Sequence, residues 1–150
     1  MAVRLQAEPF DTSAEIARLT SGRSDVGAVV SFTGICRADG ETGEISAMTL
    51  EHFPGMAEDE LGRLESDARV RWPLIDSLIV HRYGRMVPGD PIVLVVTLSA
   101  HREAAFEAAN FLMDYLKTSA PFWKKEERAG GAQWVEAKGS DDTARDRWRS

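Results

Sequence analysis

The chain has 150 residues, of which 43% are hydrophobic, and a formal net charge of -6. This length and apolar content suit one folded domain, which we assign to residues 1–150 with a polar tail from about residue 141, and they exclude an intrinsically disordered chain. The negative net charge argues against a nucleic-acid-binding protein, and no apolar segment approaches the roughly 20 residues that span a bilayer.

The cysteine content and the first residues bear on the cellular compartment. Cys36 is the only cysteine, so no disulfide can form within the chain. This is usual in the reducing cytoplasm. The first ten residues, MAVRLQAEPF, contain no apolar stretch of the kind that a secretory signal requires. We therefore expect a cytoplasmic protein.

Apolar periodicity predicts strands and helices that alternate only in part. In chain order, the sequence predicts a strand at 3–7, a helix capped by Asp11 or Ser13 and ending near Leu19, a buried strand at 26–36, a flexible loop at 38–43, a strand at 44–53, a helix at 57–72 that Pro73 ends, a strand at 75–83, a turn at 87–90 and a strand at 91–99. A long helix capped by Ser99 follows to about Thr118, and a hairpin at 122–127 and 133–138 turns around Ala129–Gly131. This order favours an α+β domain over a doubly wound sheet.

The segment Ser99-Ala100-His101-Arg102 combines a helix start with two basic side chains. The first turn of a helix has unpaired N–H groups and a partial positive charge, so it favours anions. His101 and Arg102 add positive charge where the helix dipole disfavours it, and a bound phosphate or carboxylate would relieve this conflict. Side chains that simply face water or pair with Glu103 explain the pattern at least as well.

Two lysines, Lys117 and Lys124, lie on either side of a turn that contains Pro121. Lysines that converge on one pocket can act as a nucleophile or transfer protons. A simpler explanation exists for each, because a cation in the last helical turn is favoured by the dipole and a lysine on a strand is usually solvated.

Arg37 directly follows the predicted strand at 26–36 and is a third candidate for anion binding. Arginine binds phosphate through two parallel hydrogen bonds. On the same strand, Phe32 is more typical of a packed core residue and Cys36 of a small buried one.

No metal site is predicted, because His52 and His81 have no ligand spacing with carboxylates or with the cysteine. No motif for a phosphate loop or a nucleophilic serine is present either. The residues by themselves therefore predict an α+β domain with an anion pocket built from His, Arg and Lys.

Several long motifs resemble one family when they are taken in order. FTGICR is followed by LEHFPGM at 50–56, PGDPIVLVVTLSAHREAAFEA at 88–108, MDYLKTSAPFWKKE at 113–126 and then WVEA. These segments closely resemble the large subunit of molybdopterin synthase. The resemblance covers about residues 25–141, whereas the N-terminal segment and the last few residues match weakly.

This resemblance implies an α/β-hammerhead type fold with a mostly antiparallel sheet, packed helices and a C-terminal hairpin. It also implies a homodimer that carries a small ubiquitin-like subunit at each end, which makes a heterotetramer. The small subunit ends in Gly-Gly with a thiocarboxylate, and its tail enters a pocket of the large subunit. Two sulfur transfers then build the dithiolene of molybdopterin on cyclic pyranopterin monophosphate. Such a sulfurtransferase needs no cofactor and no metal held by the enzyme.

The family's catalytic lysines correspond to Lys117 of DYLKT and Lys124 of PFWK. Lys117 is expected beside the thiocarboxylate, and Lys124 near charge on the pterin side chain or its phosphate. The substrate-binding positions correspond to Arg37, His101, Arg102, Phe32 and Met113. The resemblance further implies that Arg37 reaches the pocket of the other subunit across the dimer.

Two other functions fit parts of this pattern. A non-catalytic module could hold a ubiquitin-like Gly-Gly tail in the same fold, although the presence of both Lys117 and Lys124 argues against it. An unrelated anion-binding enzyme, such as a phosphoester hydrolase, would usually need a metal cluster or a nucleophile–base pair, and the sequence shows neither.

Overall fold

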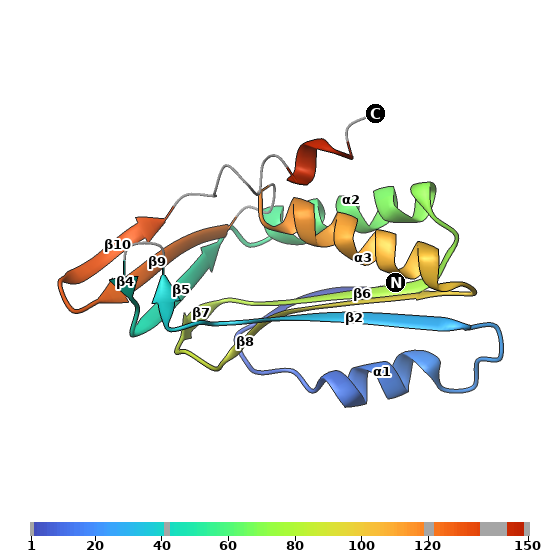
Figure 1. Cartoon of the computed structure of the whole chain (residues 1–150), viewed down its shortest axis with the longest axis horizontal. Helices are drawn as coiled ribbons and strands as arrows, with labels where there is room; N and C mark the ends of the chain where they lie inside the picture. Colours follow the sequence, from blue (N-terminus) through green and yellow to red (C-terminus); the bar gives the residue numbers. More distant parts are fainter. Residues whose placement is uncertain (1, 41–42, 119–121, 136–143, 149–150) are drawn as a thin grey trace.

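The computed structural model describes residues 2–40, 43–118, 122–135 and 144–148. A four-stranded sheet forms the centre, with helices α2 and α3 on one face and α1 on the other (Figure 1). Its strands are, in spatial order, β1 (Ala2–Gln6), β6 (Leu74–Arg82), β8 (Pro91–Ser99) and β2 (Ala28–Ile35). β1 runs parallel to β6, and the remaining neighbours are antiparallel.

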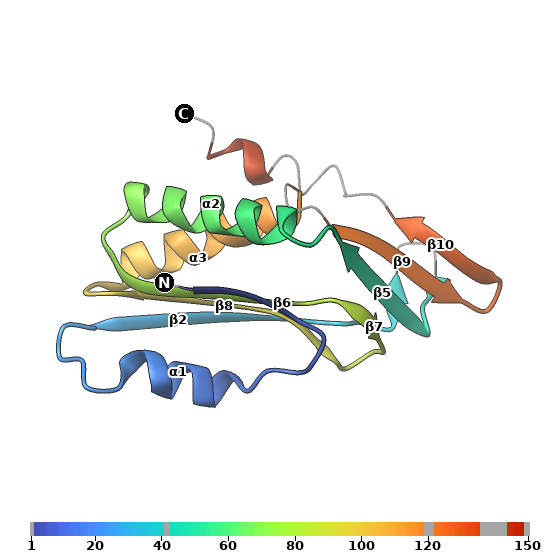
Figure 2. The ribbon, with the colours of Figure 1, turned by 180° about the vertical axis from the view of Figure 1, so that it is seen from behind.

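A second four-stranded sheet lies at one end of the central sheet, as the views from both sides show (Figures 1 and 2). Its strands are, in spatial order, β10 (Gly131–Val135), β9 (Phe122–Arg128), β5 (Ala47–His52) and β7 (Gly84–Met86), all antiparallel. A two-stranded sheet joins β3 (Asp39–Gly40) to β4 (Gly43–Glu44). The predicted α+β class, the mostly antiparallel pairing and the hairpin formed by β9 and β10 are thereby confirmed.

Local sequence signals set the helix boundaries. The helices are α1 (Thr12–Thr20), α2 (Met56–Arg71) and α3 (Arg102–Leu116). Asp11, one of the two predicted caps, accepts a hydrogen bond at 3.1 Å from the backbone N–H of Ala14. α2 ends ahead of Pro73, as predicted. In the described part of the chain, each helix is too short or too polar to cross a bilayer.

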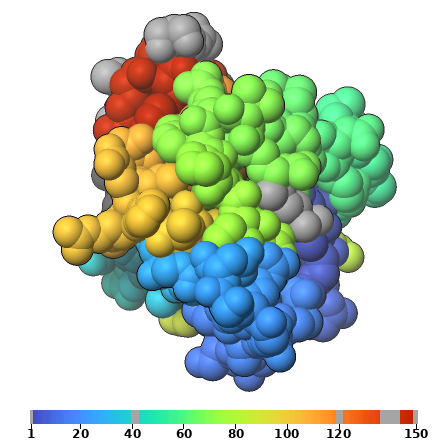
Figure 3. All heavy atoms as spheres, turned by 90° about the vertical axis from the view of Figure 1, so that its right-hand side faces the viewer, coloured from blue at the N-terminus to red at the C-terminus, as the bar shows by residue number. Residues whose placement is uncertain are grey.

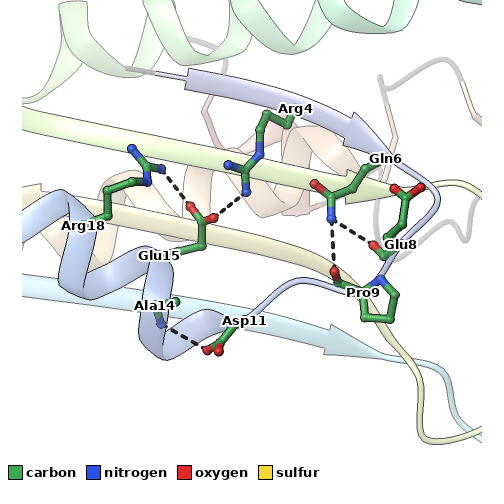
Figure 4. Close-up of polar contacts among 8 residues, drawn as sticks. All are labelled: Arg4, Gln6, Glu8, Pro9, Asp11, Ala14, Glu15 and Arg18. Carbon is green, nitrogen blue, oxygen red and sulfur yellow. Dashed lines mark hydrogen bonds and ion pairs between the residues drawn. The ribbon is translucent and has the colours of Figure 1, made fainter.

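An arginine–glutamate–arginine cluster ties α1 to β1 (Figure 4). The carboxylate of Glu15 accepts hydrogen bonds from Arg4 at 2.6 Å and from Arg18 at 2.7 Å. Burial by itself raises the pKa of Glu15, but the hydrogen bonds from Arg18 and Arg4 outweigh burial and hold this pKa below its ordinary value. The cluster therefore favours the charged carboxylate and holds α1 against the sheet.

β8 supplies side chains to both faces of the central sheet, because residues alternate along a strand. Val93 and Val95 pack in the cluster under α2 and α3, whereas Leu94 and Val96 pack in the cluster that includes Leu19 of α1. All five valines and leucines of β8 are buried. A continuous apolar run is what a strand covered on both faces requires.

The prediction of a buried strand at 26–36 is wrong, because β2 is an edge strand of the central sheet. β2 lies at the end of the strand order, with β8 as its neighbour. Val29, Phe32 and Ile35 are 38%, 40% and 54% exposed. A run of β-branched and apolar residues is typical both of a central strand buried within its own chain and of an edge strand that another molecule can cover. The sequence pattern therefore does not distinguish the two.

Two smaller predictions also differ from the structure. The sequence predicts Ser99 as the cap of α3, but Ser99 ends β8, and its hydroxyl donates to the Pro73 carbonyl at 3.0 Å. The N-cap of α3 is His101 instead. The predicted flexible loop at 38–43 contains β3 and the first residue of β4, with residues 41 and 42 outside the described residues.

The described part of the predicted polar tail, residues 144–148, packs against the helices. The Trp148 ring lies edge-on to Trp72, the C-cap of α2, and to Phe111 of α3, with ring centroids 5.5 and 5.7 Å away. Its indole N–H and the guanidinium of Arg147 both donate to the carboxylate of Asp114. One tryptophan in a polar segment therefore bridges α2 and α3. Residues 136–138 of the predicted last strand lie outside the described residues.

Candidate functional site

Predicted site residues lie at both ends of α3. His101 is the N-cap, Arg102 is the first helical residue and Lys117 is the C-cap. The helix has 15 residues. At a rise of about 1.5 Å per residue, its ends are roughly 22 Å apart. Within one chain, the predicted cations therefore form two separate groups.

The first group lies at the end of the molecule that Figure 3 shows, where atoms at the start of α3 (gold) project from the surface. His101 and Arg102 are both exposed, and His101 forms no side-chain cap hydrogen bond. Neither side chain forms a hydrogen bond or ion pair with another described residue, so the pairing with Glu103 that the sequence allowed is not observed. The first-turn N–H groups and two cations thus face solvent, where an anion can reach them.

The second group lies where α3 ends and the second sheet begins (Figure 1). Lys117 is exposed at the C-cap of α3, and Lys124 is half-buried on β9. The ammonium Nζ of Lys124 lies 3.6 Å from Oε2 of Glu126, whose carboxylate is buried. The two lysines therefore occupy the two sides of the connection at 119–121, which lies outside the described residues.

Arg37 belongs to the same end of the molecule as Lys124. It follows Cys36, whose thiol is buried. Burial raises the pKa of Cys36, Asp90 adds to this effect, and the nearby ammonium of Lys124 opposes it. A buried thiol with a raised pKa is a poor nucleophile. The exposed Arg37 is thus on the Lys124 side of its own chain, whereas the resemblance implied a role in the pocket of the other subunit.

Phe32 and Met113 lie on neighbouring elements. Phe32 is 40% exposed on the β2 edge, so it is not the packed core residue that the sequence favoured. Met113 is partly buried against the cluster under α2 and α3, one helical turn before Lys117. β2 and α3 contact each other along the sheet.

The described residues also form a hollow of about 470 Å³ at the turn between β9 and β10. Its lining includes Gly43, Glu44 and Gln133, and it includes none of the predicted site residues. Among the described side chains, no group of three or more His, Cys, Asp or Glu could hold a metal ion. This hollow is therefore separate from the candidate site, which consists of the predicted cations near the two ends of α3.

Sequence reasoning missed two neighbours of Lys124. Glu126 is buried and forms ion pairs with both Lys124 and Arg128. Phe122 stacks on the buried ring of His81, with centroids 4.0 Å apart. The alternation of Phe122, Lys124 and Glu126 along a strand places all three on one face and could have indicated both neighbours.

Comparisons with known proteins agree with this architecture. The family model described as MoaE protein matches residues 5–119. The molybdopterin synthase catalytic subunit of Mesorhizobium japonicum is 61% identical, over 99% of this chain and 93% of the relative. The molybdopterin biosynthesis MoaE protein from Burkholderia ambifaria superposes with a TM-score of 0.83 at 46% identity, covering 99% of each chain. A complex of subunits 1 and 2 of molybdopterin-converting factor from Helicobacter pylori shares the fold at 18% identity, with a TM-score of 0.71 over 91% of this chain and 90% of that one.

Proposed function

The chain belongs to the MoaE family of molybdopterin synthase catalytic subunits, and we propose that it transfers sulfur to cyclic pyranopterin monophosphate. The sulfur donor is the C-terminal thiocarboxylate of a small ubiquitin-like partner that ends in Gly-Gly. Two such transfers build the dithiolene of molybdopterin, which makes the enzyme a sulfurtransferase. The reaction takes place in the cytoplasm, in keeping with a lone cysteine that is free and buried.

The observation that carries this proposal is the placement of Lys117 and Lys124 on the two sides of one connection, with Arg37 at the same end of the molecule. The phosphorylated substrate and the thiocarboxylate tail both bring negative charge, and cations fixed beforehand stabilise charge that develops during a reaction. We assign stabilisation of the thiocarboxylate and proton transfer to Lys117. Lys124 stabilises charge on the pterin side chain or phosphate, and Arg37 binds the phosphate.

A second copy of the chain completes the site in this proposal. Within one chain, the start of α3 lies roughly 22 Å from Lys117. β2 begins at Ala28, which pairs with the last residue of β8 just before α3, and it ends at Ile35, two residues before Arg37. Two β2 edges that meet in antiparallel order about a twofold axis would bring the start of α3 in one copy to the Arg37 end of the other. His101 and Arg102 then act in the partner's site.

The exposed side chains along this edge support the same arrangement. Val29, Phe32 and Ile35 of β2 are exposed, and α3, which contacts β2, carries Phe106, which is 60% exposed. An unpaired strand edge readily pairs with another chain, and the interfaces of homodimers are more apolar than the rest of the surface. The twofold contact would cover these apolar side chains and bring Phe32 to the boundary of the pocket.

Each end of the homodimer receives one small subunit in this proposal, which gives a heterotetramer. The Helicobacter pylori protein that shares this fold was solved as a complex of two subunits. A Gly-Gly tail suits a narrow passage because glycine has no side chain, and an extended tail can bind through its backbone groups. A module that only held such a tail would not need Lys117 or Lys124.

A mixing experiment tests the residues and the dimer together. A Lys117→Ala variant and a His101→Ala/Arg102→Ala variant are combined in equal amounts under conditions that exchange subunits. Activity is assayed at a pterin concentration well below KM, where each variant is impaired as a homodimer. In a mixed dimer, one site joins the intact Lys117 of one copy to the intact cations of the other. Half of the dimers are mixed and each has one intact site of two, so activity with the thiocarboxylated partner should return to about a quarter of the wild-type value.

The matched control combines Lys117→Ala with Lys124→Ala. Both residues lie on the same side of the site, so neither site of a mixed dimer is intact and activity should stay low. Recovery in this control, or no recovery in the first mixture, would contradict a site shared between two copies. Near-normal turnover by Lys117→Ala alone would contradict the catalytic assignment itself.

A further inference from the structure

A stacked pair of rings joins the central sheet to the sheet that carries Lys124. His81 belongs to β6 of the central sheet, and Phe122 begins β9 of the second sheet. Their ring centroids are 4.0 Å apart and their planes are 16° from parallel. His52 of β5 pairs in register with Phe122 and lies 4.6 Å, between ring centroids, from Tyr83. The junction between the sheets is thus built from histidine and aromatic rings.

A hydrogen bond to the backbone fixes the orientation of the His81 ring. Nδ1 lies 2.9 Å from the carbonyl oxygen of Arg82, and because a carbonyl only accepts, Nδ1 carries the proton. The Arg82 guanidinium is itself buried and donates to the carbonyls of Ala7 at 2.9 and 3.0 Å and of Pro91 at 2.8 Å. Burial lowers the pKa of His81 to about 4, so the ring is neutral at pH 7. Phe122 therefore packs against an imidazole ring that is fixed in orientation and stays uncharged at pH 7.

The position of Phe122 determines the position of Lys124. Residues two apart on a strand point to the same face and are separated by about 6.6 Å along it. Lys117 lies at the end of α3, over the central sheet, whereas Lys124 belongs to the second sheet. The relative placement of the two amines therefore depends on contacts that fix one sheet against the other, and the His81–Phe122 stack is such a contact.

We infer that His81 is a positioning residue for Lys124, which it holds relative to Lys117 through its stack with Phe122. This inference rests on the proposed function, because it takes Lys124 as a catalytic group. His81 touches neither substrate nor tail in this role. Its effect on turnover passes entirely through the lysine, and this separates it from a residue that only stabilises the fold.

The test compares His81→Leu with His81→Phe. Leucine removes the flat ring, so kcat should fall by about tenfold or more while KM for the pterin changes little, since misplacement by about 1 Å can cost that much. Phenylalanine keeps a flat ring and should restore most of kcat. Because His81 acts through Lys124, the His81→Leu/Lys124→Ala double variant should be no slower than Lys124→Ala alone. Leu78→Val, on the same strand but in the cluster facing α1, is the control and should leave kcat unchanged.

Three results would overturn the inference. One is an unchanged kcat in folded His81→Leu, and another is a double variant whose losses multiply. Should His81→Leu not fold, Phe122→Leu probes the same stack from β9 and must show the same dependence on Lys124. A Lys124→Ala variant with near-normal turnover is the third result and would also remove the proposed role of Lys124, whereas the first two leave that role intact.

Discussion

The indole N–H of Trp148 donates a hydrogen bond to the carboxylate of Asp114 at 2.5 Å, although 34 positions separate the two residues. Arg147 donates to the same carboxylate, at 2.7 Å. Asp114 lies on α3 one turn before Lys117 and is buried. The segment at 144–148 is therefore attached to the part of α3 that ends in a proposed catalytic residue.

Trp148→Ala should lower the free energy of unfolding by about 2–4 kcal/mol, because it removes a packed aromatic ring and leaves the Asp114 carboxylate short of one donor. Trp148→Phe should lose less, since the ring contacts remain. Urea unfolding measures both variants. Trp134→Ala is the control, because Trp134 is 56% exposed on β10 and its loss should cost little. Equal losses for the two alanine variants would show that Trp148 does not bridge the helices.

The stability of the protein should fall in mild acid because of His81. Burial, with a smaller effect from His52, lowers the pKa of His81 from 6.5 to about 4. Between these values the unfolded chain binds a proton that the folded chain does not. The free energy of unfolding should therefore decrease as pH falls through this window, by roughly 3 kcal/mol in total. His81→Phe should remove this part of the pH dependence, and identical pH profiles for the two proteins would refute the assignment.

Glu15→Gln should destabilise the protein by about 1 kcal/mol at pH 7, because it weakens two partly exposed ion pairs. The pKa of Glu15 lies below its ordinary value of 4.5. Its contribution is therefore present above that value and is lost as pH falls through the lower pKa of the folded state. Thermal unfolding of variant and wild type should converge in strong acid. Glu60→Gln, which affects only the surface pair with Arg63 within α2, should have a smaller effect.

The two groups of cations should differ in kinetic effect. Lys117→Ala should abolish conversion of the pterin while leaving fold and partner binding intact, whereas Arg102→Ala should mainly raise the apparent KM. Steady-state kinetics with the thiocarboxylated partner separates the two effects. Lys125→Ala is the control, since Lys125 lies beside the Trp134 ring on the other face of β9 from Lys124. An Arg102→Ala variant with unchanged KM would exclude the phosphate role.

Much of the fold follows from local sequence signals. β8 was predictable as 91–99 because its apolar run is continuous, and α2 because its apolar residues recur at helical spacing and Pro73 ends it. The edge position of β2 was not predictable, since β-branched residues such as Val29 and Val30 suit either position in a sheet. The cap of α3 was misplaced because Ser99 is a good cap by type, but its hydroxyl bonds to Pro73.

The candidate site was predictable as residues but not as an arrangement. The sequence predicted one anion pocket built from His, Arg and Lys, whereas the 15 residues of α3 separate His101 from Lys117, so one chain holds two groups of cations. The ion pair of Lys124 with Glu126 lies within β9 and follows from the alternation of residues along a strand, whereas the stack of Phe122 on His81 depends on how the two sheets meet. No local sequence pattern specifies how the central sheet and the second sheet are placed against each other.

The length of α3 has a consequence for how two sulfur atoms reach one substrate. If each copy contributes the start of α3 to one reaction centre and the end of α3 to the other, the two centres of a dimer are about one helix length, roughly 22 Å, apart. A half-sulfurated pterin held by its phosphate in one centre cannot be reached from the other. The second sulfur must then arrive on a fresh small subunit that replaces the spent one at the same centre. The half-sulfurated pterin therefore stays bound while the small subunits exchange.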